Sequence, residues 1–392
     1  MQTVIGESVL FSVFLIFTGA ALLATVALYA RQSLLIAYIA LGVLCGPSGV
    51  GLVDDPHLIE DIAHVGIIFL LFLLGIDMCP RKLLELMREA IGVTLASTLV
   101  FALLGYGIAA AVGLSQPDCL LVGIATTLSS TIISLKLLPT TVLHHRHTGE
   151  VIISILLLQD LLAIAALLYL HTMAGGGTSW LQNTVQFAGL PALFLGGLLA
   201  ERAVLRPLFQ RFDKVGEYVF LLALGWCLGF AQLAQSLGLS YEVGAFIGGI
   251  TLANSPIAPF IADSLRPLRD FFLVMFFFAI GAAFNLSSAA DIWPGALALA
   301  LAVVLVKPLT YRILFRNFGE SPILAGEAGV RLGQMSEFSL LLVAVALQVQ
   351  VMSTKAGALV QLATLITFVI SSTVVVFRYP NPIALSERLR RD

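Results

Sequence analysis

One feature repeats over the whole sequence: runs of about 20 mostly apolar residues, separated by short polar segments. A hydrocarbon core about 30 Å thick is crossed by a helix of roughly 20 residues, so each run is long enough to span a membrane. Runs of this length satisfy their backbone groups only as helices. We therefore predict an all-α polytopic membrane protein with 13 transmembrane helices, at 8–30, 33–50, 60–78, 89–112, 117–138, 150–172, 188–206, 216–236, 241–262, 267–286, 292–314, 322–348 and 354–377.

The composition agrees with this fold class. Hydrophobic residues make up 59% of the 392 residues and charged residues 11%, whereas a soluble domain carries about 25% charged residues. The net charge of −2 gives no indication of a nucleic-acid partner. The first apolar run follows no positively charged segment, so we interpret it as a retained helix and not as a cleaved signal peptide. No metal-like spacing relates the four cysteines, Cys45, Cys79, Cys119 and Cys227.

The basic residues of the loops indicate the orientation, because cytoplasmic loops carry an excess of Lys and Arg. One set of alternate loops holds only Lys355. The other set holds Arg31, Arg81, Lys82, Arg88, Lys136, Arg146, Arg202, Arg206, Arg211, Lys214, Arg266, Arg269, Arg312, Arg316, Arg378, Arg388, Arg390 and Arg391. We therefore expect a multi-pass protein of the inner (plasma) membrane, with its N-terminus outside and its C-terminus in the cytoplasm.

Two charged residues fall near the centres of apolar spans. Asp160 lies in "LLLQDLL" and Lys307 in "ALAVVLVKPLTY". An ionisable side chain at membrane depth costs about 3 kcal/mol on insertion scales and marks a functional site by default. Opposite charges at similar depth are expected to pair. A static ion pair would stabilise the bundle only weakly, so a proton or cation site explains the placement better.

Two spans contain polar interruptions. The segment "GIATTLSSTIISL" interrupts span 5, and "GVRLGQMSEFSLL" interrupts span 12. Such clusters either join helices by hydrogen bonds or let a helix open around a substrate site, and two matched interruptions favour the second interpretation. The spans are seven passes apart, so they run in opposite directions, as inverted repeats of spans 2–6 and 9–13 require. The polar residues concerned are Thr126, Thr127, Ser129, Ser130, Thr131, Gln334, Ser336 and Glu337.

Three further features admit more than one interpretation. Glu337 is either a second titrating group or a cap of the half-helix after the interruption. Arg331 follows Glu327 by four residues and is expected to pair with it on one helix face. The cluster "HHRH", with His144, His145 and His147, is more simply a solvated basic loop than a pH sensor or a metal site.

These elements together resemble the monovalent cation:proton antiporter family 2, and within it the Kef-type potassium/proton branch. The resemblance covers the whole membrane part. Sodium/proton members of the fold typically show Asp-Asp or Asn-Asp where this chain has Gln159 and Asp160, and the Gln-Asp form is similar to the potassium-linked branch. The matching segments are "LSST", "LLLQD", "GAFIGGITLANS", "LVMFFFAIGAAFNL" and "GQMSEFSLLL".

The resemblance implies inverted repeats with two crossed discontinuous helices, as in the NapA and NhaA antiporter fold, and a homodimer. It implies a transport part at about 89–172 and 267–348 that moves against a scaffold part at about 1–78, 188–262 and 354–377. Asp160 would bind proton and cation in turn, and Gln159 would supply an oxygen beside it. Lys307 would pair with the carboxylate when no cation is bound. Thr127, Ser129, Ser130 and Thr131 would complete the site.

The chain departs from this family in one respect. Kef-type proteins usually continue into a cytoplasmic nucleotide-binding regulatory domain, and no GxGxxG segment follows the last span here. We expect such a regulator to be either a separate partner or absent from a shortened chain. Arg331 stands where a neutral residue is expected.

The sequence favours exchange of potassium for protons, because a neutral Gln159 oxygen offers a larger and less charged site than a second acid. A sodium/proton antiporter of the same fold is the first alternative. A gated potassium efflux channel and a sodium-coupled organic-anion symporter are further alternatives, and the central Asp and Lys disfavour the symporter. No nucleophile triad or phosphate loop indicates an enzyme, and no cofactor is expected besides the transported potassium or sodium and the proton. Membrane lipid is the expected surrounding.

Overall fold

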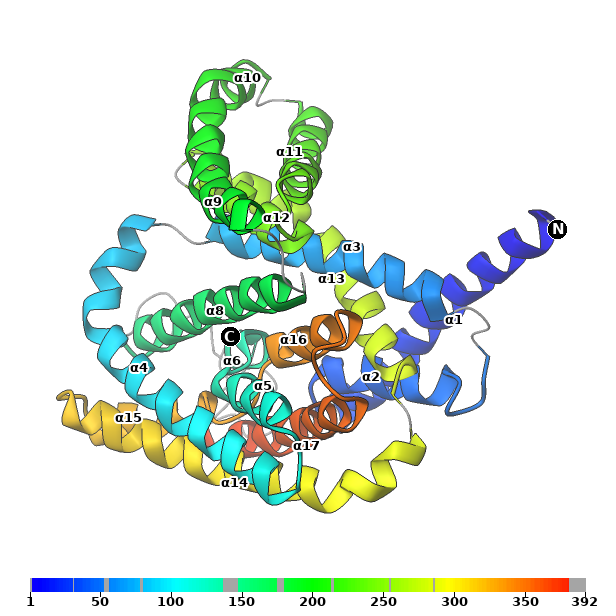
Figure 1. The fold of residues 1–392 in the computed structure, drawn as a ribbon, viewed down its shortest axis with the longest axis vertical. Coiled ribbons are helices and arrows are strands. Elements are labelled where there is room, and N and C mark those ends of the chain that lie inside the picture. Colours follow the sequence, from blue (N-terminus) through cyan, green and yellow to red (C-terminus); the bar gives the residue numbers. More distant parts are fainter. Residues whose placement is uncertain are drawn as a thin grey trace. The chain divides into compact units, whose positions relative to one another are not determined.

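The computed structural model of the chain describes residues 2–30, 32–52, 56–77, 80–136, 147–174, 180–212, 215–253, 255–284 and 286–380. Within these ranges every regular element is a helix (Figure 1). The chain divides into two compact units. The first comprises 1–53, 85–170 and 280–392, and the second comprises 54–84 and 171–279.

The first unit contains both predicted interruptions. Its α14 packs along α15 and α17, and α16 packs against α5 and α17. These helices therefore surround the interruptions from several sides. The helices of this unit are α1 (Gln2–Tyr29), α2 (Leu34–Cys45), most of α4 (Pro80–Ala111), α5 (Gln116–Thr127), α6 (Thr131–Lys136), most of α8 (His147–Ala174), α14 (Leu286–Asn317), α15 (Pro322–Arg331), α16 (Glu337–Gln348) and α17 (Thr354–Arg378).

The second unit has a core of its own, in which α12 packs against α3, α11 and α9. Phe72, Ala223, Cys227 and Ala245 are among the fully buried residues of this core. The helices of this unit are α3 (Pro56–Asp77), α9 (Trp180–Ala200), a π-helical turn (Glu201–Leu205), α10 (Arg206–Phe212), α11 (Gly216–Ser236), α12 (Tyr241–Ala253) and most of α13 (Ala258–Ala282).

Every predicted span overlaps one helix or consecutive helical segments, although several helices begin or end some residues away from the predicted boundary. Within the described ranges, six segments are long and apolar enough to cross a membrane: Leu10–Tyr29, Ala90–Ala111, His147–Leu167, Gly216–Ser236, Ile292–Asn317 and Thr354–Arg378. Four shorter apolar helices lie at Leu34–Cys45, His64–Ile76, Tyr241–Ala253 and Glu337–Gln348.

The largest difference between the prediction and the structure concerns the division between α12 and α13. We expected spans at 241–262 and 267–286, but α12 ends at Ala253 and α13 already begins at Ala258. A proline disfavours helical backbone geometry in the residue before it. Ser255 precedes Pro256 at this turn. By contrast, Pro267 lies inside α13. The chain therefore turns at the first proline and continues as a helix through the second.

Serine side chains fix several helix starts in the first unit. The Ser115 hydroxyl accepts from the Asp118 N–H at the start of α5, and Ser321 caps α15 through the Leu324 N–H. Both caps are followed within two residues by a proline, which needs no hydrogen-bond partner for its nitrogen there. The Ser353 hydroxyl caps α17 by accepting from the Ala356 N–H. These caps set where α5, α15 and α17 begin.

Glycines allow the helices around the interruptions to approach closely. A Cβ atom on Gly123 of α5 would lie 2.8 Å from the Ala102 carbonyl oxygen of α4. A Cβ atom on Gly329 of α15 would lie 2.7 Å from the Pro308 carbonyl oxygen of α14. Backbone contact at this distance is open only to glycine, so both half-helices lie directly against a neighbouring helix.

Candidate functional site

The first interruption separates α5 from α6. Helix α5 ends at Thr127, and the following Leu128 is extended with φ −78° and ψ 142°. The Thr126 and Thr127 hydroxyls both donate to backbone carbonyls of α5, at 2.7 Å each. Hydroxyl bonds of this kind compete with the helical pattern. Residues 128–130 therefore leave the helix, as the sequence predicts.

The second interruption separates α15 from α16. Helix α15 ends at Arg331 and α16 begins at Glu337. Ser336 caps α16: its hydroxyl accepts from the Phe338 N–H at 3.0 Å, and its own N–H donates to the Ser339 hydroxyl at 3.3 Å. Both predicted interruptions are thus present, and both lie in the first unit.

The two interruptions contact each other directly. The Ser129 hydroxyl donates to the Leu332 carbonyl at 2.9 Å, and the Ser134 hydroxyl donates to the Arg331 carbonyl at the same distance. The Gln334 amide donates to the Ser134 hydroxyl at 3.0 Å. These bonds join segments about 200 positions apart in the sequence. The opened backbones therefore satisfy one another where no water is expected.

Asp160 lies midway along α8 and is 2% exposed. Its two carboxylate oxygens lie 3.5 and 3.4 Å from the Thr131 hydroxyl, at the start of α6. Among the described residues no Lys, Arg or His nitrogen lies within 4 Å of this carboxylate. A buried carboxylate with so few donors is free to take up a proton or a cation.

Gln159 lies beside Asp160 but turns its amide to the first interruption. Its side-chain oxygen accepts from the Ser129 N–H at 3.0 Å. Its side-chain nitrogen donates to the Thr127 carbonyl at 3.0 Å and to the Tyr311 hydroxyl at 2.7 Å. We expected this oxygen to stand beside the carboxylate. In the structure it is hydrogen-bonded to the backbone instead.

The expected ion pair between Asp160 and Lys307 is not formed. The Lys307 ammonium is fully buried and donates to the Leu128 carbonyl at 2.7 Å, the Gln334 carbonyl at 3.1 Å and the Ser129 hydroxyl at 3.2 Å. An ammonium group has three donors, and three oxygens of the two interruptions occupy them. It also lies 5.0 Å from the centre of the Phe101 ring. Lys307 therefore links both interruptions and does not contact the carboxylate.

Arg331 and Glu327 form the expected ion pair along α15, with 2.9 Å between Nη2 and Oε1. The Arg331 side chain also donates to the Pro380 carbonyl at 2.8 Å, just after α17. Glu337 is buried in the first turn of α16. Gln334 accepts from the Ser371 hydroxyl at 2.9 Å and so also connects to α17.

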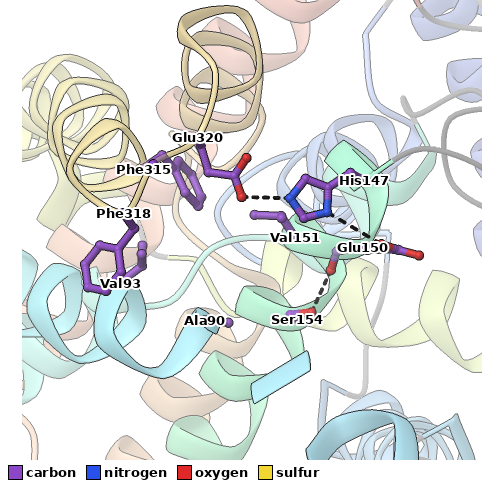
Figure 2. Close-up of a pocket in the computed structure, with 10 residues that line it drawn as sticks. Ala90, Val93, His147, Glu150, Val151, Ser154, Phe315, Phe318 and Glu320 are labelled. Atoms are coloured by element: carbon purple, nitrogen blue, oxygen red, sulfur yellow. Dashed lines mark hydrogen bonds and ion pairs between the residues drawn. The ribbon is translucent and has the colours of Figure 1, made fainter. Parts of the chain in front are cut away.

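Of the histidine cluster, His144 and His145 lie outside the described residues. His147 begins α8, with Nε2 2.8 Å from Glu320 and Nδ1 3.6 Å from Glu150 (Figure 2). It lines a cavity of about 420 Å³ whose wall includes Phe315 and Phe318. Within the described residues no group of three His, Cys, Asp or Glu side chains is arranged to hold a metal ion.

The sequence reasoning missed Tyr311, which is fully buried and contacts Gln159. It follows Lys307 by four residues on α14, which places both on one helix face. The sequence signal for this role was a tyrosine hydroxyl one helical turn after a buried lysine, in "KPLTY".

A helix bundle in which two broken helices meet beside a buried carboxylate is typical of a secondary transporter. The chain belongs to the sodium/hydrogen exchanger family, because the transmembrane model of that family matches residues 13–378. The protein is thus a multi-pass membrane protein of the cation:proton antiporter class. The narrower Kef-type assignment is not confirmed by this match.

The fold is that of a solved antiporter. The structure of the sodium proton antiporter MjNhaP1 from Methanocaldococcus jannaschii at pH 8 matches with a TM-score of 0.69 and 18% identity, over 94% of this chain and 96% of that chain. A second structure of MjNhaP1, from electron microscopy, gives a TM-score of 0.65, 18% identity and 95% coverage of both chains. The predicted antiporter fold is confirmed.

Proposed function

We propose that the protein exchanges a monovalent alkali cation for protons by alternating access, and that Asp160 binds the proton and the cation in competition. The observation that carries this proposal is the buried Asp160 carboxylate, next to Thr131 and beside two joined helix breaks. Family membership supports the reaction class.

Exchange requires a group that holds only one of its two ligands at a time. A carboxylate in a dehydrated cavity has this property, because either a proton or a cation neutralises its charge. A neutralised site is less costly to move past an apolar barrier than a bare carboxylate. Asp160 with the Thr131 hydroxyl supplies the first oxygens of such a site. The hydroxyls of Ser129 and Ser130 belong to the same break.

Sodium and potassium remain competing substrates in this proposal. A preference for potassium through Gln159 requires its side-chain oxygen beside Asp160, but that oxygen accepts the Ser129 N–H. The family and the fold likeness fit sodium at least as well. We therefore propose an alkali cation, with its identity decided by direct comparison.

We also propose the architecture that the family resemblance implies. The part at 89–172 and 267–348 moves against the part at 1–78, 188–262 and 354–377, and two copies associate in the inner membrane. This division differs in extent from the two compact units, since 1–53 and 280–392 group with the first unit.

The test is exchange by the purified protein in proteoliposomes that contain a pH-sensitive dye. Addition of sodium, potassium or lithium to acid-loaded vesicles is expected to release protons from the wild-type protein. Asp160→Asn is expected to abolish the response to every cation, because an amide neither titrates nor carries the charge that a cation needs. Asp263→Asn is the matched control, since Asp263 is exposed and its ion pair within the described residues is with Arg266, three residues later.

Retained exchange by Asp160→Asn would contradict the assignment of this residue. An unresponsive wild-type protein would contradict the reaction itself. The ratio of half-maximal concentrations for sodium and potassium identifies the preferred cation.

A further inference from the structure

The side-chain amide of Gln159 bridges the first helix break. Its oxygen holds the N–H of Ser129 and its nitrogen holds the carbonyl of Thr127, on either side of the extended Leu128. A primary amide has two N–H donors and one carbonyl acceptor. Both donors are used, one by Thr127 and one by Tyr311, and the acceptor is used by Ser129. The amide is thus fixed by its partners.

Among the described residues, the side-chain partner of this amide is the Tyr311 hydroxyl of α14, at 2.7 Å. The ring is fully buried, packs edge-on against Phe101 at 5.3 Å and stacks on Phe315 at 5.9 Å. Because the ring is packed on two sides, the position of its hydroxyl is already fixed before the hydrogen bond forms. Tyr311 therefore presents a fixed acceptor to the Gln159 amide.

The hydrogen bonds of the break also decide which oxygens are left for a cation. The Thr127 carbonyl accepts from Gln159, the Leu128 carbonyl from Lys307 and the Ser130 carbonyl from Ser134. By contrast, the Thr131 hydroxyl and the Asp160 carboxylate face each other at 3.4 to 3.5 Å, a long and weak contact.

We propose that Tyr311 is a positioning residue of the exchange site: its hydroxyl fixes the Gln159 amide across the break, and that amide in turn places Thr131 against Asp160. Gln159 then acts on the cation through the shape of the break and not as a ligand. The proposal rests on the exchange function proposed above, which it makes more specific. It assigns a role to a residue on α14 that touches neither the cation nor the carboxylate.

A positioning role predicts a particular change in the kinetics. Without the hydroxyl, the break remains but the amide loses one of its three bonds, so the cation site is less well preformed. The cation concentration for half-maximal exchange is expected to rise about fivefold to tenfold, since a single hydrogen bond is worth up to about a factor of ten. The maximal rate is expected to stay within about twofold.

The experiment compares wild-type protein, Tyr311→Phe and Tyr106→Phe in proteoliposomes over a range of sodium and potassium concentrations. Tyr106 is a matched control, because it lies on α4 of the same unit and its hydroxyl has no hydrogen bond with the residues that the structure describes. Thermal unfolding in detergent without cation shows whether each variant is folded. Gln159→Met and the double variant Gln159→Met with Tyr311→Phe complete a double-mutant cycle.

The proposal predicts a raised half-maximal concentration for Tyr311→Phe, wild-type behaviour for Tyr106→Phe, and no further effect of Tyr311→Phe once Gln159 is Met. An unchanged half-maximal concentration in a folded Tyr311→Phe protein overturns the proposal, as does a lowered maximal rate alone or full additivity in the cycle. Should Tyr311→Phe not fold, Gln159→Met removes the amide with all three of its bonds. Its half-maximal concentration is then expected to rise at least as much, and an unchanged value in a folded Gln159→Met protein overturns the proposal.

The two proposals fail in different ways. A wild-type protein that moves no protons in response to cations overturns the exchange function and this inference with it. A wild-type protein that exchanges, together with an unchanged Tyr311→Phe, overturns only the positioning role.

Discussion

Two buried aspartates of the first unit differ in how many donors surround them. Asp118 accepts from the Ser115 hydroxyl, the Ser353 N–H and the Ser353 hydroxyl, each at 2.8 Å. Within the part of the chain that the structure describes, Asp160 accepts only the long contacts from Thr131. A carboxylate whose oxygens already accept several short hydrogen bonds has little capacity left for a further ligand, whereas one with few donors is available to a proton or cation. At the residue scale, the hydrogen-bond partners and not burial separate a structural carboxylate from a candidate exchange site.

The role of Asp118 can be tested by Asp118→Asn. The amide keeps one acceptor but turns an NH₂ group toward two donors, so the caps of α5 and α17 lose bonds. We expect the free energy of unfolding to fall by about 1–2 kcal/mol, seen as a lower unfolding temperature in detergent. The half-maximal cation concentration is expected to stay unchanged.

The control for this substitution is Asp270→Asn, because Asp270 is exposed and pairs with the neighbouring Arg269. Equal unfolding temperatures for the two variants would show that Asp118 does not join the two caps.

At the element scale, the close approach of α15 to α14 depends on a bare backbone. A Cβ atom on Gly329 would lie 2.7 Å from the Pro308 carbonyl oxygen, whereas one on Gly326 of the same helix would meet nothing within 4 Å. Gly329→Ala is expected to push the helices apart and to lower the free energy of unfolding by about 1–3 kcal/mol. Gly326→Ala is expected to be neutral or to stabilise by up to about 1 kcal/mol, because alanine favours a helix.

Thermal unfolding of both variants in detergent checks this pair. Since α15 ends at the second helix break, Gly329→Ala is also expected to reduce exchange more than Gly326→Ala does. Equal unfolding temperatures would show that α15 can shift away from α14 without cost.

The sequence was sufficient to predict the helices, because apolar runs of about 20 residues mark them. It also predicted both breaks, because clusters of hydroxyl side chains interrupt two of these apolar runs. It also located Asp160 and Lys307 for the same reason. It could not show that Lys307 binds Leu128 and Gln334, since such contacts join segments 179 and 27 positions apart. Tyr311 was missed because a tyrosine in an apolar helix resembles ordinary packing until its partner, 152 positions away, is known.

At the scale of the whole molecule, the orientation in the membrane follows from one asymmetry of the loops. Lys355 is the single basic residue of its loop set, and it lies exposed at the start of α17. Arg316 belongs to the opposite set and lies exposed at the end of α14. The excess of Lys and Arg in one set predicts that this set faces the cytoplasm. Lys355 and Arg316 are thus expected on opposite sides.

Cysteine labelling in cells tests this prediction. A membrane-impermeant maleimide is expected to label Lys355→Cys in intact cells, and to label Arg316→Cys only after the cells are permeabilised. The unsubstituted chain gives the background of its own cysteines, of which Cys45, Cys119 and Cys227 are buried. The reverse pattern would place the C-terminus outside, and labelling of both positions in intact cells would mean that the number of spans between them is even. Because α15 and α16 count as one broken span between these positions, the result also tests whether the second interruption is a break within a single pass.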